Sequence, residues 1–381
     1  MLIGGKVRNV NKIELSNDAY PVLVVHVGVG DYNNLDEAIL IEKKKIEGAL
    51  KLGADLICDV SMSDEMAYVH KKFLDEYSVP FGTVSAYEAY IKAEKNNLNY
   101  NEKNFVELFK EEVLRGFDLI TIHATVFKED RRLIEDSNRL ISTTSRGGML
   151  MLKLMEHNKY ENPYYTYYDE ILDICKEYDV CLSLGPCYRP ASVCDCSLDD
   201  ELLLLELQRM SELCKRAIDK GVGITIEGIG HAPLNLIEPM IKMAKEKCHD
   251  VPYRVMTVST DIALGYDHIS SAIASANAVY HGANSVTAVS RSEHLGIPTY
   301  EESMEAVKSA KVAIYSGYIA RTGDLQRDKK MSIAREKKGC IGHIPSTLFP
   351  NEPLRTSKRK NKACSMCGPY CPLNELDGDD E

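Results

Sequence analysis

The sequence predicts a (β/α)8 barrel over residues 1–320, followed by a helical and irregular arm over residues 321–381 that carries a cysteine motif. Three observations lead to this fold. Seven or eight short apolar runs alternate with helical patterns, which is the order of a parallel α/β barrel. The runs are continuously apolar, as parallel strands buried on both faces are. No G-x-G-x-x-G or Walker-type loop follows the first run, which disfavours a doubly wound nucleotide-binding sheet.

The elements follow in a regular order along the chain. The helix after the first strand begins at Asn34, with Glu37 in the position of a capping box, and ends at Gly53. A later helix opens with the pair Ser197 and Asp200 and ends at a glycine. Residues 321–339 are typical of an exposed helix, and the proline-rich segment after them is expected to be irregular, so the cysteine motif lies on an extended arm. The predicted strands span residues 22–29, 54–61, 80–85, 118–124, 181–185, 223–228, 253–259 and 285–290.

Composition narrows the class of protein. Hydrophobic residues make up 44% of the 381-residue chain, and the formal net charge of −11 offers no electrostatic footprint for nucleic acid. No apolar run approaches the roughly 18 residues of a membrane helix, and the first residues do not resemble a signal peptide. We therefore expect a cytoplasmic protein without nucleic-acid or membrane partners. Its twelve cysteines then indicate metal binding or catalysis in preference to disulfides.

Polar residues stand at the ends of the predicted strands. In a (β/α)8 barrel the carboxyl ends of the strands meet at one face, where such enzymes carry out their chemistry. We expect these side chains to converge on a single cavity. They are His26, Asp59, Ser61, Ser85, His123, Ser183 and Glu227.

Two histidines and a carboxylate form one candidate site. Glu227 is expected to end a strand, and His231 follows four residues later in a turn flanked by glycines. His294 follows the run 285–290. A carboxylate and imidazoles at a barrel mouth suit acid–base chemistry or metal binding. The two histidines could share one divalent metal, or each could be an independent hydrogen-bonded side chain; their spacing does not decide between these readings.

A short glycine-containing loop forms a candidate phosphate site. Ser145 and Arg146 precede Gly147 and a second glycine, so that backbone N–H groups could face an anion while the guanidinium neutralises it. Arg189 is a possible second partner for the same anion.

Cys364, Cys367 and Cys371 form a C-x2-C-x3-C run near the end of the chain. Three thiolates would leave one iron of a 4Fe–4S cluster open to a substrate or cofactor. A zinc site would need a fourth ligand, for which His343 is the nearest candidate. Unliganded thiols are the third reading.

Together these segments resemble the phosphomethylpyrimidine synthase (ThiC) family of thiamine biosynthesis. The resemblance runs from about residue 53 to 371 and is carried by the motifs "IEGIGHAP", "TDIALGYDHISSAIASA", "SEHLGIP" and "CSMCGP", with looser matches at "DLITIHA" and "TSRGG". It implies an atypical radical S-adenosylmethionine enzyme on a (β/α)8 barrel, with a 4Fe–4S cluster, an additional divalent metal such as zinc or iron, and an imidazole ribonucleotide as substrate. It also implies a homodimer and an electron donor such as flavodoxin or ferredoxin.

The resemblance assigns roles by position. It implies that Glu227 is catalytic as well as substrate-binding. Cys364, Cys367 and Cys371 would hold the cluster, and His231 and His294 the divalent metal. The remaining substrate-binding positions would be Cys58, Tyr87, His123, Ser145, Arg146, Gly147 and Arg189.

The chain also departs from the pattern of that family. The second gap in the cysteine run is one residue shorter. In the pocket, Cys58 stands in place of methionine, Pro186 of an acid, Cys187 of glycine and Arg254 of an aromatic residue, while His26 takes the place of an asparagine. Exchanging an acid for a neutral residue and gaining an arginine is expected to make the pocket more positive.

Several readings of function remain at this point. The leading one is rearrangement of aminoimidazole ribonucleotide, or a close relative, to a pyrimidine phosphate through a 5′-deoxyadenosyl radical. The altered pocket leaves open a paralogue that makes 5-hydroxybenzimidazole or another product. A metal-dependent barrel hydrolase or lyase with a zinc-binding tail, using His231, His294 and Glu227, is the alternative from another class. A non-catalytic relative is the last.

Overall fold

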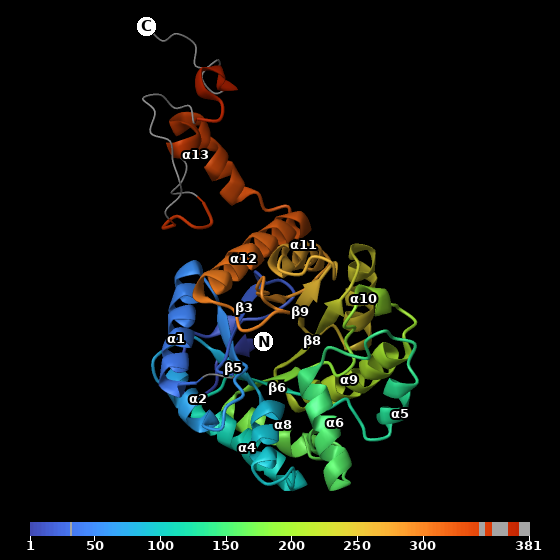
Figure 1. Ribbon diagram of the computed structural model, residues 1–381. Coiled ribbons are helices and arrows are strands. Elements are labelled where there is room, and N and C mark those ends of the chain that lie inside the picture. The colour runs from blue at the N-terminus through green and yellow to red at the C-terminus, as the bar shows by residue number, and fades with distance from the viewer. Residues whose placement is uncertain (31–32, 343–346, 353–364, 373–381) are drawn as a thin grey trace. The chain divides into compact units, whose positions relative to one another are not determined.

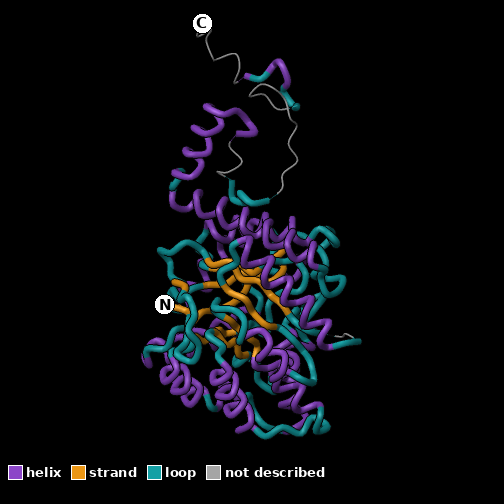
Figure 2. The backbone as a smooth tube through the Cα atoms, turned by 90° about the vertical axis from the view of Figure 1, so that its left-hand side faces the viewer, coloured by secondary structure: helices purple, strands orange, loops and turns teal. Residues whose placement is uncertain are grey.

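Eight parallel strands close into a barrel, which confirms the predicted fold. The structure is a computed structural model that describes residues 1–30, 33–342, 347–352 and 365–372. The strands pair in the order β10-β3-β4-β5-β6-β7-β8-β9. In Figures 1 and 2 they lie inside a ring of helices. The eight barrel strands are β3 Val22–Val27, β4 Leu56–Asp59, β5 Phe81–Val84, β6 Leu119–Ile122, β7 Cys181–Leu184, β8 Ile224–His231, β9 Tyr253–Val258 and β10 Ser285–Thr287.

The helices of the barrel begin and end where local sequence favours it. Helix α1 has Asn34 as its N-cap and Gly53, in the left-handed conformation, as its C-cap, as predicted. Helix α9 begins after Asp200, whose carboxylate caps it, so the predicted opening at Ser197 is three residues too early. The helices are α1 Leu35–Leu52, α2 Met66–Leu74, α3 Ser85–Glu94, α4 Glu102–Arg115, α5 Asp130–Glu135, α6 Arg146–Asn158, α7 Pro163–Thr166, α8 Tyr168–Tyr178, α9 Glu201–Lys220, α10 Leu234–Lys247, α11 Asp267–Tyr280 and α12 Tyr300–Thr322.

A small antiparallel pair, β1 Leu2–Ile3 and β2 Ile13–Glu14, precedes the barrel. Ile3 and Leu15 form one apolar cluster with the first inward-facing residues of the barrel strands, among them Val22, Leu56 and Leu119. This cluster fills the amino-terminal end of the barrel, since those residues open their strands. The space for a ligand therefore lies at the opposite, carboxyl-terminal end, as in other (β/α)8 barrels.

Arg8 fastens the N-terminal segment to the barrel. Its guanidinium donates to the carbonyl oxygens of residues 74, 77, 79 and 116 and, at 2.8 Å, to the carboxylate of Asp118. Asp118 is buried, and it also accepts from the backbone of Gly5.

Arg8→Ala is expected to lower the free energy of unfolding by about 3 kcal/mol, because a buried carboxylate loses its cation. Chemical denaturation measures this. Lys12→Ala, which breaks the exposed pair with Asp179, should change it by less than about 1 kcal/mol, and equal losses in the two variants would contradict this account.

The chain divides into two compact units, Met1–Arg321 and Thr322–Glu381. The second unit contains helix α13, Gln326–Gly342, and a 3-10 turn at Gly368–Tyr370. Helix α13 begins inside the segment 321–339 that was predicted as exposed helix and ends three residues after it. Among the described residues, no helix is both long enough and apolar enough to cross a membrane.

Candidate active site

A cavity of about 590 Å³ opens at the carboxyl-terminal end of the barrel. Its walls bring together every barrel residue that the sequence singled out as catalytic, metal-binding or substrate-binding. These are Cys58, Tyr87, His123, Ser145, Arg146, Gly147, Arg189, Glu227, His231 and His294. His26, where the chain departs from the family pattern, lines the same space. Their roles stay predictions, but the geometry places them around one space.

Contrary to expectation, four of the seven polar strand-end residues do not line this cavity: Asp59, Ser61, Ser85 and Ser183. The carboxylate of Asp59 lies 3.5 Å from the imidazole of His70 on α2, and Ser61 donates a hydrogen bond to Asp59. Ser85 is the buried first residue of α3. Successive side chains of a barrel strand alternate between the interior and the surrounding helices, so a position at a strand end does not by itself fix the direction of its side chain.

One end of the cavity has the features of an anion-binding site. Ser145 caps α6 and accepts from the backbone of Gly148, whereas the earlier N–H groups of this first turn have no acceptor within the helix. Arg146 extends over the ring of Tyr87, with its guanidinium carbon 4.9 Å from the ring centre. A Cβ at Gly147 would lie 2.2 Å from the His123 ring, so only glycine lets the helix approach that imidazole.

Two buried polar atoms beside this helix end have no hydrogen-bond partner among the described residues. They are Nε of Arg189 and Nδ1 of His123. Burial, together with the charge of Arg189, lowers the pKa of His123 to about 4, so its imidazole is neutral at pH 7. Buried polar atoms without a partner are costly unless a ligand satisfies them, and Nε of Arg189 is a donor in every state. The arrangement therefore suits a phosphate or another oxyanion.

Glu227 is held by a set of donors at the floor of the cavity. One oxygen, Oε1, accepts from Ser183 at 2.6 Å, from Thr121 at 3.0 Å and from Arg254. Burial alone would raise the pKa of Glu227, but the Arg254 guanidinium and the Ser183 hydroxyl lower it below its ordinary value. Glu227 is thus a carboxylate at pH 7, and its second oxygen is the one left for a ligand.

The positive charge of Arg254 is balanced by the carboxylate of Glu227. It is 5% exposed, pairs with Glu227, and lies 3.4 Å from the sulfur of Cys58. Burial and the same arginine lower the pKa of His26 to about 3, so His26 adds no charge. The expected gain of positive charge is therefore largely compensated at the floor of the cavity, because the added cation is paired with Glu227.

His231 and His294 lie next to each other at the cavity wall, with ring centres 5.1 Å apart. Strand β8 continues through His231, so the predicted turn after Glu227 is wrong: residues 228–231 pair with β9 instead. Nδ1 of His231 is 2.7 Å from Asp261, and Nδ1 of His294 is 3.0 Å from Asp267.

These two carboxylates leave Nε2 of each ring available, which is the usual orientation of metal-ligating histidines. Among the described residues, however, no group of three His, Cys, Asp or Glu side chains could hold a metal. A metal bound by these two histidines would have to take its other ligands from substrate or solvent.

The cysteine run is described in part. Cys364 and His343 lie outside the described residues. Cys367 and Cys371 flank the 3-10 turn Gly368–Tyr370, and Cys371 is 1% exposed. A tight turn between two thiols suits ligands of one compact cluster.

Two features of the site were not predicted from the sequence. Thr121 looks like an ordinary strand residue until Glu227 is placed beside it, and Asp261 and Asp267 stand in a loop and a helix distant in sequence from their histidines. Cys187, read as a pocket departure, instead faces away from the cavity, with its sulfur 3.2 Å from the hydroxyl of Thr125. Spacing in sequence carries no signal for such pairings.

Comparison with known proteins agrees with this geometry. The model of the radical SAM ThiC family matches residues 22–377. A phosphomethylpyrimidine synthase from Thermus thermophilus is 36% identical over 352 residues, which cover 90% of this chain and 80% of that protein. One from Clostridium acetobutylicum is 34% identical over 360 residues, which cover 92% and 81%. A solved dihydropteroate synthase from Coxiella burnetii, in complex with pteroic acid, covers 85% of this chain and all of its own with 13% identity and a TM-score of 0.48, a likeness too low to indicate a shared function.

Proposed function

The chain belongs to the radical SAM ThiC family, and on that premise we propose that it is an S-adenosylmethionine-dependent enzyme that rearranges aminoimidazole ribonucleotide or a close relative. The observation that supports this substrate class most directly is the anion end of the cavity. Arg189 presents an unpaired buried donor and His123 an unpaired buried ring nitrogen beside the first turn of α6, where the phosphate of a ribonucleotide would bind.

The chain's own residues would hold the substrate at both ends. Arg146 and Arg189 would neutralise the phosphate, and the free oxygen of Glu227 would accept a hydrogen bond from the base. The surrounding barrel would keep water away from a reactive intermediate. His231 and His294, oriented by their aspartates, would hold a divalent metal, zinc or iron.

Cys364, Cys367 and Cys371 would carry a 4Fe–4S cluster. When bound and reduced by a donor such as flavodoxin or ferredoxin, that cluster would supply the electron that splits S-adenosylmethionine into methionine and a 5′-deoxyadenosyl radical. A cytoplasmic homodimer is part of the same proposal.

A second outcome within the family is favoured by the cavity floor. Arg254 occupies space there and engages Glu227 directly, and His26 and Cys58 adjoin it as neighbours on β3 and β4. A floor of this composition favours a changed substrate or product, such as 5-hydroxybenzimidazole, over simple drift. The metal-dependent hydrolase receives less support, because three donors already occupy one oxygen of Glu227.

The experiment is to incubate the reconstituted, reduced protein with S-adenosylmethionine and aminoimidazole ribonucleotide and to identify the product by mass. Hydroxymethylpyrimidine phosphate supports the first outcome and 5-hydroxybenzimidazole the second. If neither S-adenosylmethionine nor aminoimidazole ribonucleotide were consumed, both proposed outcomes would be contradicted.

A further inference from the structure

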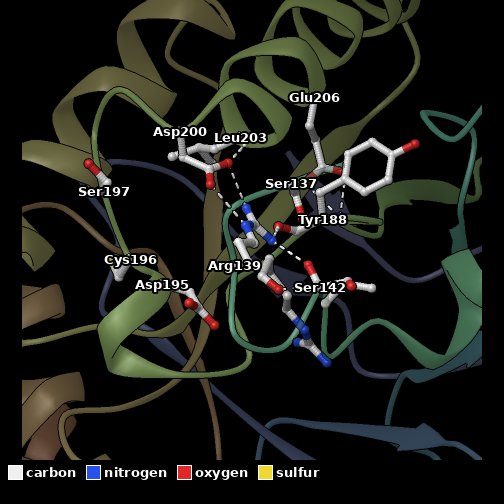
Figure 3. A network of polar contacts seen from close by, with 12 residues as sticks. Ser137, Arg139, Ser142, Tyr188, Asp195, Cys196, Ser197, Asp200, Leu203 and Glu206 are labelled. Carbon is white, nitrogen blue, oxygen red and sulfur yellow. Dashed lines mark hydrogen bonds and ion pairs between the residues drawn. The ribbon is translucent and has the colours of Figure 1, made fainter. Parts of the chain in front are cut away.

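A buried arginine outside the cavity joins the two loops that carry its anion-binding residues. Arg139 lies in the loop before α6, and its side chain is only 2% exposed. Its guanidinium forms a two-pronged ion pair with Asp200, through Nε at 2.9 Å and Nη2 at 2.7 Å. Asp200 in turn caps α9 by accepting from the backbone of Leu203. Figure 3 shows the guanidinium between these groups.

The same guanidinium also binds two backbone carbonyls, one from each loop. Nη1 donates to the carbonyl oxygen of Ser142 at 2.7 Å and to that of Tyr188 at 2.6 Å, as Figure 3 shows. Ser142 lies four positions before Arg146, and Tyr188 immediately precedes Arg189. One rigid planar group therefore sets the separation of the two segments that end in the candidate phosphate ligands.

Further contacts run along the same seam. Asp195 accepts from the backbone N–H groups of Leu140 and Ile141, at 2.7 and 3.0 Å. Thr143 donates to the carbonyl of Cys187 at 2.8 Å, and the N–H of Thr144 donates to the carbonyl of Arg189 at 3.3 Å. Hydrogen bonds thus join the segment 139–144 to the segment 187–195 at several points, next to the anion end of the cavity.

We propose that Arg139 is a positioning residue that holds Arg146 and Arg189 at the spacing needed to bind one phosphate group. It touches no ligand itself; it acts through Tyr188 and Ser142. This inference rests on the proposed ribonucleotide substrate, and it adds the residue that sets the enzyme's preference for a phosphorylated ligand over the corresponding nucleoside.

The test measures the dissociation constants of aminoimidazole ribonucleotide and of its nucleoside, which lacks the phosphate, for the full chain and for Arg139→Lys. Lysine keeps the charge, but its three N–H donors cannot replace the four hydrogen bonds of Arg139, two to the carboxylate and one to each carbonyl. In Arg139→Lys we expect the dissociation constant of the ribonucleotide to rise about 10- to 100-fold, where each tenfold step corresponds to about 1.4 kcal/mol. The dissociation constant of the nucleoside should change by less than about twofold, because it has no phosphate to contact Arg146 and Arg189. Asp200→Asn, isosteric and still able to cap α9, should shift the ribonucleotide in the same direction by a smaller factor, and it serves if Arg139→Lys does not fold.

Arg115→Lys is the matched control. Arg115 is also a largely buried arginine that grips a carboxylate, Glu88, but on the outer helices α3 and α4. It should lower the melting temperature without changing the preference for the phosphorylated ligand. Equal weakening of both ligands in Arg139→Lys, or an unchanged preference, would overturn the positioning role. A wild-type chain with no preference for the ribonucleotide would overturn the proposed substrate, and the positioning role with it.

Discussion

Cys371→Ser is expected to abolish the proposed cleavage of S-adenosylmethionine. If Cys364, Cys367 and Cys371 carry the cluster, losing one thiolate leaves a second iron without a protein ligand, and the cluster should not assemble stably. Formation of 5′-deoxyadenosine from S-adenosylmethionine should fall by on the order of 10³-fold or more, the scale of losing an essential reactive group. Iron and sulfide bound per chain, and the paramagnetic signal after reduction, should fall with it.

The control for this prediction is Cys194→Ser. Cys194 is an exposed cysteine of the barrel unit, and it plays no part in the proposed site. It should retain its iron, sulfide and activity. A Cys371→Ser protein that keeps a full complement of iron and sulfide would show that the cysteine run is not the cluster site.

Arg254→Met and Glu227→Gln are each expected to lower the free energy of unfolding by about 3–5 kcal/mol, because each leaves a buried charge without its partner. The double variant should be more stable than the sum of the two losses predicts, with a coupling energy of about 2 kcal/mol. Denaturation of the four proteins at pH 7 measures the cycle. Lys215→Met, which breaks an exposed pair with Asp219, should change stability by less than about 1 kcal/mol.

The pair also makes a prediction about pH. In the wild type the pKa of Glu227 is below its ordinary value, so its contribution to stability is present at neutral pH and is lost as the pH falls through the folded-state pKa. In Arg254→Met, burial without the cation should raise the pKa of Glu227 instead. The free energy of unfolding of Arg254→Met should then decline as the pH rises through that raised pKa, which is opposite in sign to the contribution of Glu227 in the wild type. Additive losses at pH 7 with unchanged pH slopes would show that the two side chains do not act as a pair.

The sequence predicted the barrel because strands buried on both faces are written as plain apolar runs, and each of the eight runs became a strand. It missed β1 and β2, since two-residue strands leave no periodic signal. It also placed a turn after Glu227, because glycines usually mark turns, whereas here Gly228 and Gly230 lie within β8.

The candidate site was predictable wherever function is carried by residue type at a strand end or helix start, as at His123 and Ser145. It was not predictable where function depends on a partner from another loop. The partners of three such residues are distant in sequence and meet them only in the folded chain: Asp261, Asp267 and Arg139. The sequence of strand β4 also does not show that the carboxylate of Asp59 points to His70 on helix α2.

In the proposed function, a cluster held by the cysteine run cleaves S-adenosylmethionine for a reaction on a nucleotide bound in the barrel. The most direct test of this function is to reconstitute the full chain anaerobically with iron and sulfide, reduce it, add S-adenosylmethionine, and measure 5′-deoxyadenosine with and without aminoimidazole ribonucleotide. The account predicts a reduced-cluster signal and 5′-deoxyadenosine formation that depends on the cysteine run and rises when the ribonucleotide is present. Stoichiometric zinc without a cluster signal, or an intact cluster that leaves S-adenosylmethionine uncleaved, would contradict it.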